Sequence, residues 1–213
     1  YKRLRSLLQI REKYEELIDK ELFFSYKQYQ AMDVPISDCI DYMSGTSDLT
    51  EEKNYLRLKN DGIVYQLLTG ATTKDLQQVV LNDGIPIKRF VHKEGLLVTR
   101  KGKAGSTRYL APGKYVLNDD AYILFCKEYA PYEINLEWLS IQYKEAFLSF
   151  ASSSDNGTWN MTGFFEHTRI DIPSIQEQKY VASLYAKTEK RISAIQRIEC
   201  RFNLLLSKEV QIA

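Results

Sequence analysis

The stretch Ile170-Asp-Ile-Pro-Ser-Ile-Gln-Glu-Gln178 opens the longest helical pattern in the chain. The Ser174 hydroxyl can accept the amide hydrogen three residues on while Glu177 reaches back, which is the capping-box arrangement. No Gly or Pro follows up to about residue 211, and apolar positions recur every three or four residues: Val181, Tyr185, Thr188, Ile192, Ile195, Phe202 and Leu206. At a rise of ~1.5 Å per residue, such a helix would reach roughly 55 Å. It is too long for one small domain to enclose, so we expect it to protrude, to pair with another helix, or both.

A second helical pattern lies at the other end of the sequence. Residues 1–24 are rich in Leu, Arg, Lys and Glu, contain no Gly or Pro, and carry one stripe formed by Leu7, Ile10, Tyr14, Leu17 and Phe24. Both terminal patterns resemble coiled-coil helices. We therefore predict that they pack against each other antiparallel, although ordinary core packing explains the first stripe equally well.

The residues between the two patterns differ in character. All ten Gly and all five Pro lie between residues 34 and 173. The expected strands are Tyr55–Leu58, Ile63–Leu68, Leu96–Thr99, Tyr115–Leu117 and Tyr122–Phe125, and the expected helices are Thr73–Leu81 and Leu136–Ala151. The predicted fold class is α+β: an irregular mixed α/β domain at 27–173, flanked by long helices at 1–26 and 174–213 that form an antiparallel coiled coil.

The composition excludes several classes of protein. With 44% hydrophobic residues the chain can bury a core, and 29 Lys+Arg against 28 Asp+Glu exclude a uniformly basic coat or an acidic tail. No transmembrane or signal segment is recognisable, so we expect a cytoplasmic protein with no membrane partner. The three cysteines are far apart, which argues against disulfides and structural zinc. The chain begins at Tyr1, which leaves open that it is a fragment of a longer polypeptide.

Motifs of enzymes are not found. His92 and His167 lack HxH or HExxH partners, and the sequence has no GxSxG turn and no phosphate-binding GxxxxGK[ST]. Gly102-Lys-Ala-Gly105 precedes a β-prone run rather than a helix, so we interpret it as a turn. We likewise interpret Asp119-Asp120 as a turn. No catalytic residue, metal ligand or cofactor is therefore predicted, and an unrecognised enzyme, such as a methyltransferase or nuclease fragment, is kept as a weaker alternative.

Positive charge is concentrated in one segment. Residues 88–108 contain a single anion, Glu94, and seven cations: Lys88, Arg89, Lys93, Arg100, Lys101, Lys103 and Arg108. Cations around a glycine turn can approach a phosphate backbone closely, and such contacts dominate attraction to DNA. A solvated face balanced by nearby acids, Asp119, Asp120 and Glu128, is the alternative.

Two polar loops carry chemistry suited to reading bases. One contains Thr69, Thr72, Thr73 and Lys74, and the other contains Asn156, Thr158, Trp159 and Asn160. Amides pair with adenine, cations with guanine, and a threonine methyl with thymine. Because such clusters are first of all turns, they support DNA binding only if they lie beside the basic segment.

The whole pattern resembles one half of the specificity subunit of type I restriction-modification enzymes. Three stretches carry the resemblance: Glu94–Gly105, with its basic residue and Gly-x-x-Gly turn, Asp155–Thr162, with its Gly-Thr loop, and Ile170–Gln178, with its proline and Glu-Gln helix start. They span about residues 27–211. The family's full subunit has two recognition domains in tandem, whereas only one is present here.

The resemblance implies a non-catalytic, cofactor-free protein whose target recognition domain reads one half of a bipartite double-stranded DNA target. Its helices would act as a spacer, and adenine methyltransferase subunits would dock beside them, with a restriction subunit as a further candidate partner. A second recognition half would come from tandem fusion or dimerisation. We assign Arg100, Lys101, Lys103, Ser106 and Arg108 to DNA contacts around the basic turn, with the two polar loops near base edges. The alternative is a coiled-coil protein-protein interaction module that does not bind DNA.

Overall fold

The computed structural model of the chain describes residues 5–6, 8–13, 15–16, 33–47, 49, 54–57, 62–70, 76–82, 84, 86–152 and 157–210, the last with backbone only at 199 and 202–210. The chain divides into two units. One is formed by Ala31–Ile172, and the other combines Tyr1–Gln30 with Pro173–Ala213.

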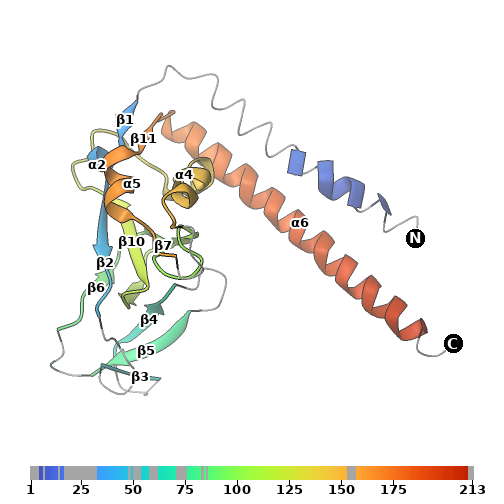
Figure 1. The fold of residues 1–213 in the computed structure, drawn as a ribbon, viewed down its shortest axis with the longest axis horizontal. Helices are drawn as coiled ribbons and strands as arrows, with labels where there is room; N and C mark the ends of the chain where they lie inside the picture. The colour runs from blue at the N-terminus through green and yellow to red at the C-terminus, as the bar shows by residue number, and fades with distance from the viewer. Residues whose placement is uncertain are drawn as a thin grey trace. The chain divides into compact units, whose positions relative to one another are not determined.

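The central unit contains two larger sheets (Figure 1). The first is antiparallel, in the order β2 (Ile40–Ser44), β10 (Ala121–Cys126), β7 (Gly95–Thr99) and β8 (Thr107–Leu110). The second has the order β3 (Tyr55–Arg57), β5 (Gln77–Leu81), β4 (Val64–Leu68), β9 (Lys114–Leu117) and β6 (Arg89–Val91), with β4 and β9 parallel. A short pair, β1 (Val34–Pro35) with β11 (Arg169–Ile170), joins the two ends of the unit.

Strand β7 is buried on both faces. All five of its residues are buried, as expected for a strand covered on each side. On one face, Leu97 joins Ile123 of β10 in a core cluster with Leu68 and Leu117 of the five-stranded sheet. Gly95 is needed for this packing, because a Cβ there would come within 2.6 Å of the Ile123 side chain.

The described residues of the same unit form four short helices: α2 (Ile36–Cys39), α3 (Leu136–Gln142), α4 (Lys144–Ser149) and α5 (Met161–His167). Aromatic side chains connect α4 with α5. The ring of Phe164 lies 4.6 Å from that of Phe147 and 4.9 Å from that of Trp159. Trp159 in turn lies 5.9 Å from Tyr122 of β10, so this cluster packs on the four-stranded sheet.

The hairpin between β7 and β8 turns at two glycines with positive φ, Gly102 at 83° and Gly105 at 79°. Inside it, the Gly105 amide donates to the Thr99 carbonyl at 3.0 Å and the Ser106 amide to the Lys103 carbonyl at 3.0 Å. The predicted turn is therefore confirmed. Gly105 also lies directly against the backbone of Phe147 in α4, with no room for a Cβ.

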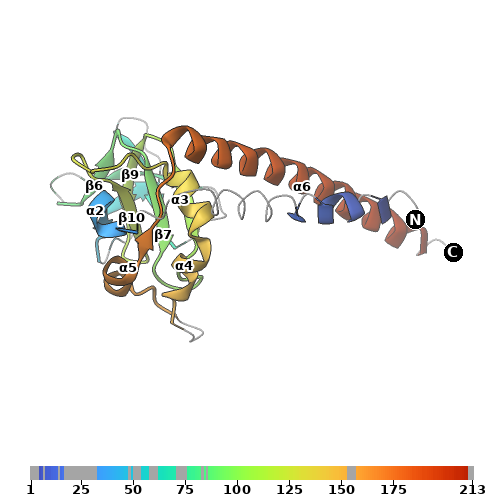
Figure 2. The same cartoon turned by 90° about the horizontal axis from the view of Figure 1, so that it is seen from above.

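Helix α6 spans Ile175–Val210 as one continuous helix (Figure 2). The predicted capping box is confirmed, since the Ser174 amide donates to the Glu177 carboxylate at 3.0 Å and the Glu177 amide to the Ser174 hydroxyl at 3.4 Å. Val181, Thr188, Ile192 and Ile195 are all buried, which confirms the predicted stripe over this part of the helix. No described helix of the chain is long and apolar enough to cross a membrane.

Of the long helix predicted over residues 1–26, the structure shows only a short part. The described residues between 5 and 16 are helical, but no long N-terminal helix and no coiled coil is shown in the described part of the chain. Leu7, Tyr14, Leu17, Phe24, Phe202 and Leu206, which the pairing needs, lie outside the described side chains. Antiparallel pairing of the terminal segments stays a prediction.

Two secondary-structure expectations need correction. The predicted helix over Thr73–Leu81 is wrong where it is described, because residues 77–81 form β5 and pair with both β3 and β4. Two adjacent β-branched residues, Val79 and Val80, fit this sheet position better than a helix. The helix predicted over Leu136–Ala151 is present as α3 and α4, separated at Tyr143, whose φ of −107° and ψ of 21° interrupt the helix.

The capping box generates the first testable prediction. Ser174→Ala removes one acceptor and one partner of Glu177, so the stability of α6 should fall by about 1 kcal/mol. Ser193→Ala, inside the same helix, should be neutral or slightly stabilising because alanine is the better helix former. Urea unfolding followed by far-UV circular dichroism measures both, and equal midpoints for the two variants would contradict the assigned cap.

The two hairpin glycines allow a matched comparison. Gly102→Ala meets no atom within 4 Å and costs only its positive φ, about 1 kcal/mol, whereas Gly105→Ala also collides with the Phe147 backbone. We expect Gly105→Ala to be the more destabilising variant by at least about 1 kcal/mol in thermal unfolding. The opposite order would mean that α4 does not pack on this turn.

Candidate nucleic-acid interface

Three segments far apart in the sequence meet where β4 and β7 end. The Thr99 hydroxyl donates to the Gly70 carbonyl at 2.9 Å, and a Cβ on Gly70 would lie 3.1 Å from the Lys101 carbonyl oxygen. Lys101 also forms an antiparallel bridge with Thr158. We call residues 69–70, 100–106 and 158–160 together the three-loop surface.

The residues predicted to contact DNA fall into three groups. Those described on the three-loop surface are Thr69, Arg100, Lys101, Lys103, Ser106, Thr158, Trp159 and Asn160. Thr72, Thr73, Lys74 and Asn156 lie outside the described residues. Arg108 is half-buried in β8, where it lies opposite Leu97 of β7. Burial raises the pKa of Tyr115, and the positive charge of Arg108 counteracts part of this rise. Arg108 therefore lies along the strand rather than in the turn.

The basic segment of the sequence is divided by β7. Lys93 and Glu94 precede the strand, whereas Arg100, Lys101 and Lys103 follow it. Five strand residues at ~3.3 Å each separate the two groups by roughly 17 Å. Glu94 accepts from the Tyr109 hydroxyl at 2.8 Å, and burial together with this carboxylate raises the pKa of Tyr109 to about 12. Seven cations that are close in sequence are thus not one patch in space.

The cations of the turn differ in their partners. The Lys101 ammonium contacts Asp119 Oδ2 at 2.9 Å and Asp120 Oδ1 at 3.1 Å, and these hydrogen bonds raise the pKa of Lys101. The same ammonium lowers the pKa of Asp119. Within the described part of the chain, the exposed Lys103 side chain has no ion pair. Lys103 is therefore the cation of the turn most open to an external anion.

Arg100 is held by the protein itself. Its guanidinium donates to the Asp119 carbonyl at 3.1 Å and lies 5.8 Å over the ring of Tyr122. Its amide donates to the Asp120 carbonyl at 2.8 Å, and its carbonyl accepts from the Trp159 amide at 2.8 Å. Arg100 thus joins two parts of the surface through backbone and side-chain bonds.

Two residues of the third loop have structural partners. The Trp159 side chain is buried and its indole N–H donates to the Phe147 carbonyl at 2.8 Å. Asn160 is the N-cap of α5, where its Oδ1 accepts from the Gly163 amide at 3.0 Å. Thr158, by contrast, is exposed. An asparagine before Met-Thr-Gly-Phe-Phe is a recognisable helix start, and this signal could have located α5 in the sequence.

Asp119, Asp120 and Tyr122 also contact the cations of this surface, although the sequence predicted no DNA-contact role for them. The turn between β9 and β10, residues 118–120, brings both carboxylates onto Lys101. The expectation of a turn at Asp119-Asp120 is confirmed. Its position beside the basic hairpin depends on the pairing of β10 with β7, where Ala121 lies opposite Thr99.

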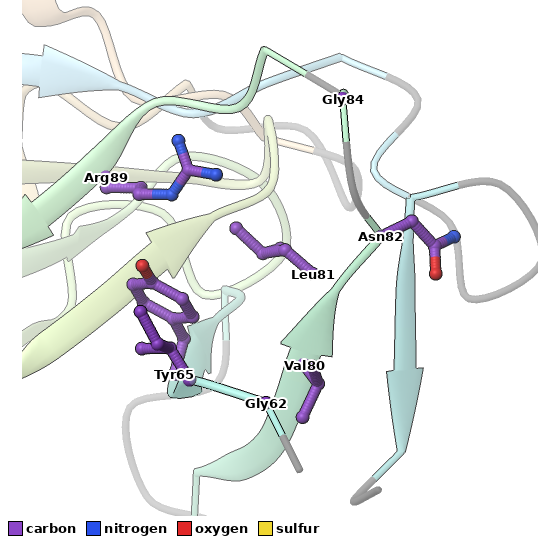
Figure 3. A pocket seen from close by; sticks show the side chains of 8 residues that line it. Gly62, Tyr65, Val80, Leu81, Asn82, Gly84 and Arg89 are labelled. Atoms are coloured by element: carbon purple, nitrogen blue, oxygen red, sulfur yellow. The ribbon is translucent and has the colours of Figure 1, made fainter.

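Two of the hollows that described residues line are found elsewhere in the central unit. The larger, about 340 Å³, is lined by α2, β2 and α5 residues including Tyr42 and Phe165, and by the carboxylates of Asp41 and Glu166. The smaller, about 180 Å³, lies between β4, β5 and β6, where Arg89 and Tyr65 face Leu81 (Figure 3). The Arg89 guanidinium is 5.9 Å from the Tyr65 ring centre. No cluster of three potential metal ligands occurs among the described residues.

Comparison with known proteins gives matches of structure only. No family model matches the sequence. No curated protein matches it either.

Solved structures match over most of the chain. The HsdS subunit from Thermoanaerobacter tengcongensis matches with a TM-score of 0.65 at 14% identity, covering 91% of this chain and 48% of that one. A chain from a structure on complex assembly and conformational transition of the type I R-M system gives 0.66 at 15% identity, covering 99% and 54%. The type I restriction-modification S subunit from M. genitalium gives 0.50 at 18% identity, covering 76% and 40%.

This chain spans about half the length of the first two structures that it matches. The resemblance inferred from the three sequence stretches is therefore confirmed at the level of structure. The fold of this chain is that of one half of an HsdS specificity subunit of type I restriction-modification systems, at low sequence identity.

Proposed function

We propose that this chain is a non-catalytic specificity protein whose central domain reads one half of a bipartite double-stranded DNA target. The observation that carries the proposal is the structural match, which covers 91% of this chain against about half of an HsdS subunit. The chemistry of the three-loop surface supports it independently, because hydroxyls, a cationic turn and a glycine-rich backbone lie side by side there. Phosphate contacts would set affinity, and the neighbouring loops would reach the base edges.

We assign a different role to each of the two units of the chain. Residues 27–173 would be the target recognition domain, and residues 1–26 and 174–213 would form the helical spacer. These proposed bounds lie close to those of the observed units, which are Ala31–Ile172 and the two terminal segments. The 36 residues of α6 reach about 54 Å at ~1.5 Å each. A continuous helix of fixed length can set the separation of two recognition modules, and half-site spacing then becomes a geometric quantity.

The proposed partners follow from the same match. Adenine methyltransferase subunits and a restriction subunit would supply catalysis. A second recognition half would come from tandem fusion or from dimerisation. Selection from a random duplex pool, with the methyltransferase partner added, tests the proposal: we expect one enriched half-site. A partner that binds regardless of salt, without any enriched sequence, would favour a coiled-coil interaction protein instead.

Within this proposal the residues have different roles. Lys103, Arg100 and Lys101 are the candidates for phosphate contacts, with Ser106 and Arg108 nearby. Thr69 and Thr158 are the described candidates for base edges, and Thr72, Thr73, Lys74 and Asn156 keep that assignment as a prediction. Trp159 and Asn160 hold the loop in place through the core and the α5 cap.

Lys103→Glu should weaken binding to all duplexes alike. Each lost phosphate contact lowers the slope of log affinity against log salt by about 0.9. Lys93→Glu makes the same change of charge at the opposite end of β7 and should leave the slope nearly unchanged. Salt titrations on a scrambled duplex measure both, and equal slopes for the two variants would place the DNA surface elsewhere.

Asn160→Ala should lower the thermal stability by about 1 kcal/mol through loss of the α5 cap. Affinities for specific and scrambled duplexes should then fall in parallel. Asn160→Asp preserves the cap but removes the amide donor that adenine readout needs, so it should restore stability, and its added negative charge should lower the affinity for both duplexes by the same factor. A selective loss on the specific duplex with Asn160→Asp would instead assign base reading to Asn160.

A further inference from the structure

The turn between β9 and β10 presents two carboxylates to the basic hairpin. Asp119 Oδ2 and Asp120 Oδ1 lie 2.9 and 3.1 Å from the Lys101 ammonium. Two anionic oxygens at hydrogen-bond distance from one ammonium reproduce the contact that a phosphate group makes with lysine. The carboxylates therefore occupy Lys101 in the way that a DNA backbone would.

The carboxylate of Asp120 is fixed by its own turn. Its Oδ2 accepts from the Asn118 side-chain amide at 3.2 Å, and its amide donates to Asn118 Oδ1 at 3.1 Å. Its carbonyl accepts from the Arg100 amide at 2.8 Å. The acidic turn is thus tied to the basic hairpin through the backbone as well as through the ion pairs.

The ion pairs remain open to exchange. The side chains of Lys101, Asp119 and Asp120 are 43%, 36% and 39% exposed. Exposed pairs of this kind are weak, so a phosphate that arrives in the right place can replace the carboxylates. A DNA backbone that no other contact holds beside Lys101 must instead compete with the two carboxylates for its ammonium group.

We propose that Asp119 and Asp120 are an internal competitor for DNA phosphate that withholds Lys101 from the DNA backbone and so lowers both the affinity of the three-loop surface and the salt dependence of that affinity. This inference rests on the proposed function and extends it to the regulation of the same surface. A lysine that carboxylates already neutralise, such as Lys101, releases few counterions from DNA when it contacts a phosphate. A duplex can contact Lys101 only when one of its phosphates replaces the two carboxylates.

A double-mutant cycle on the purified chain tests the proposal. The proteins are the wild type, Asp119→Asn/Asp120→Asn, Lys101→Met, and the triple variant, each titrated with salt on a scrambled duplex. We expect Asp119→Asn/Asp120→Asn to bind this duplex roughly tenfold more tightly, with a salt slope steeper by about 0.9, because one more phosphate contact is made. Lys101→Met should cost several times more affinity in that background than in the wild type, so the triple variant should lose the steeper slope.

Asp41→Asn/Glu166→Gln is the matched control for net charge. It removes two exposed carboxylates from the larger hollow, and Asp41 lies opposite Phe125, at the other end of β10 from the acidic turn. Its scrambled-duplex affinity should rise less than twofold. An equal rise in the control, or a gain that persists in the triple variant, would overturn the proposal, because the effect would then be general repulsion.

The selected duplex separates this inference from the proposed function. Asp119→Asn/Asp120→Asn should raise the affinity for the selected duplex at least as much as the affinity for the scrambled one, because neither complex then has to displace the carboxylates. A selective wild type together with no gain of the double variant on either duplex overturns the internal competitor alone, whereas a wild type that binds neither duplex overturns the proposed function. If the double variant has a lowered melting temperature, Asp119→Asn alone replaces it, since the Asp119 carboxylate lies outside the Asn118–Asp120 bonds. The single variant should then show a smaller rise in the same direction.

Discussion

The complete burial of strand β7 is the constraint on which the central unit depends. A five-residue strand with no exposed side chain needs a covering layer on each face, and the two layers differ. The five-stranded sheet supplies aliphatic contacts through Leu68 and Leu117 on one face. On the other, the helices carry the aromatic cluster of Phe147, Trp159 and Phe164. Because both layers are closely packed, the point where β7 ends at Thr99 is fixed, and so is the hairpin that follows.

The three-loop surface is a consequence of that fixed end. Gly105 presses the hairpin against the backbone of α4, Thr99 binds the carbonyl of Gly70, and Arg100 pairs with the segment that enters α5. Each contact involves backbone atoms, so the surface is shaped mainly by main-chain geometry. Side chains such as those of Lys103 and Thr158 can then be substituted without changing the main-chain geometry of the surface. A fold that persists at 14% sequence identity needs this separation of backbone scaffold and variable side chains.

Charge on this surface depends on pairing rather than on composition. The hairpin brings cations to the site, but the β9–β10 turn brings two carboxylates, and Lys101 lies between them. A protein that bound DNA only through unpaired lysines would hold any sequence tightly at low salt. Under the proposed function, this pairing would limit the cations available to a DNA backbone, so the geometry of one turn would set part of the affinity of the domain.

The sequence by itself determined the elements with local signals: the capping box of α6, the glycine turn after β7, and most of the strands with continuous apolar runs. It also suggested the resemblance to a specificity subunit, which the structural match supports. The tertiary structure alone decided that residues 77–81 form a strand, that Trp159 is buried, and that Asp119 and Asp120 neutralise Lys101. The physical reason is that capping and turns depend on neighbours within four residues, whereas the pairing of β5 and the neutralisation of Lys101 depend on partners farther along the chain. Gln77 pairs with Leu67, 10 positions away, and Lys101 with Asp119, 18 positions away.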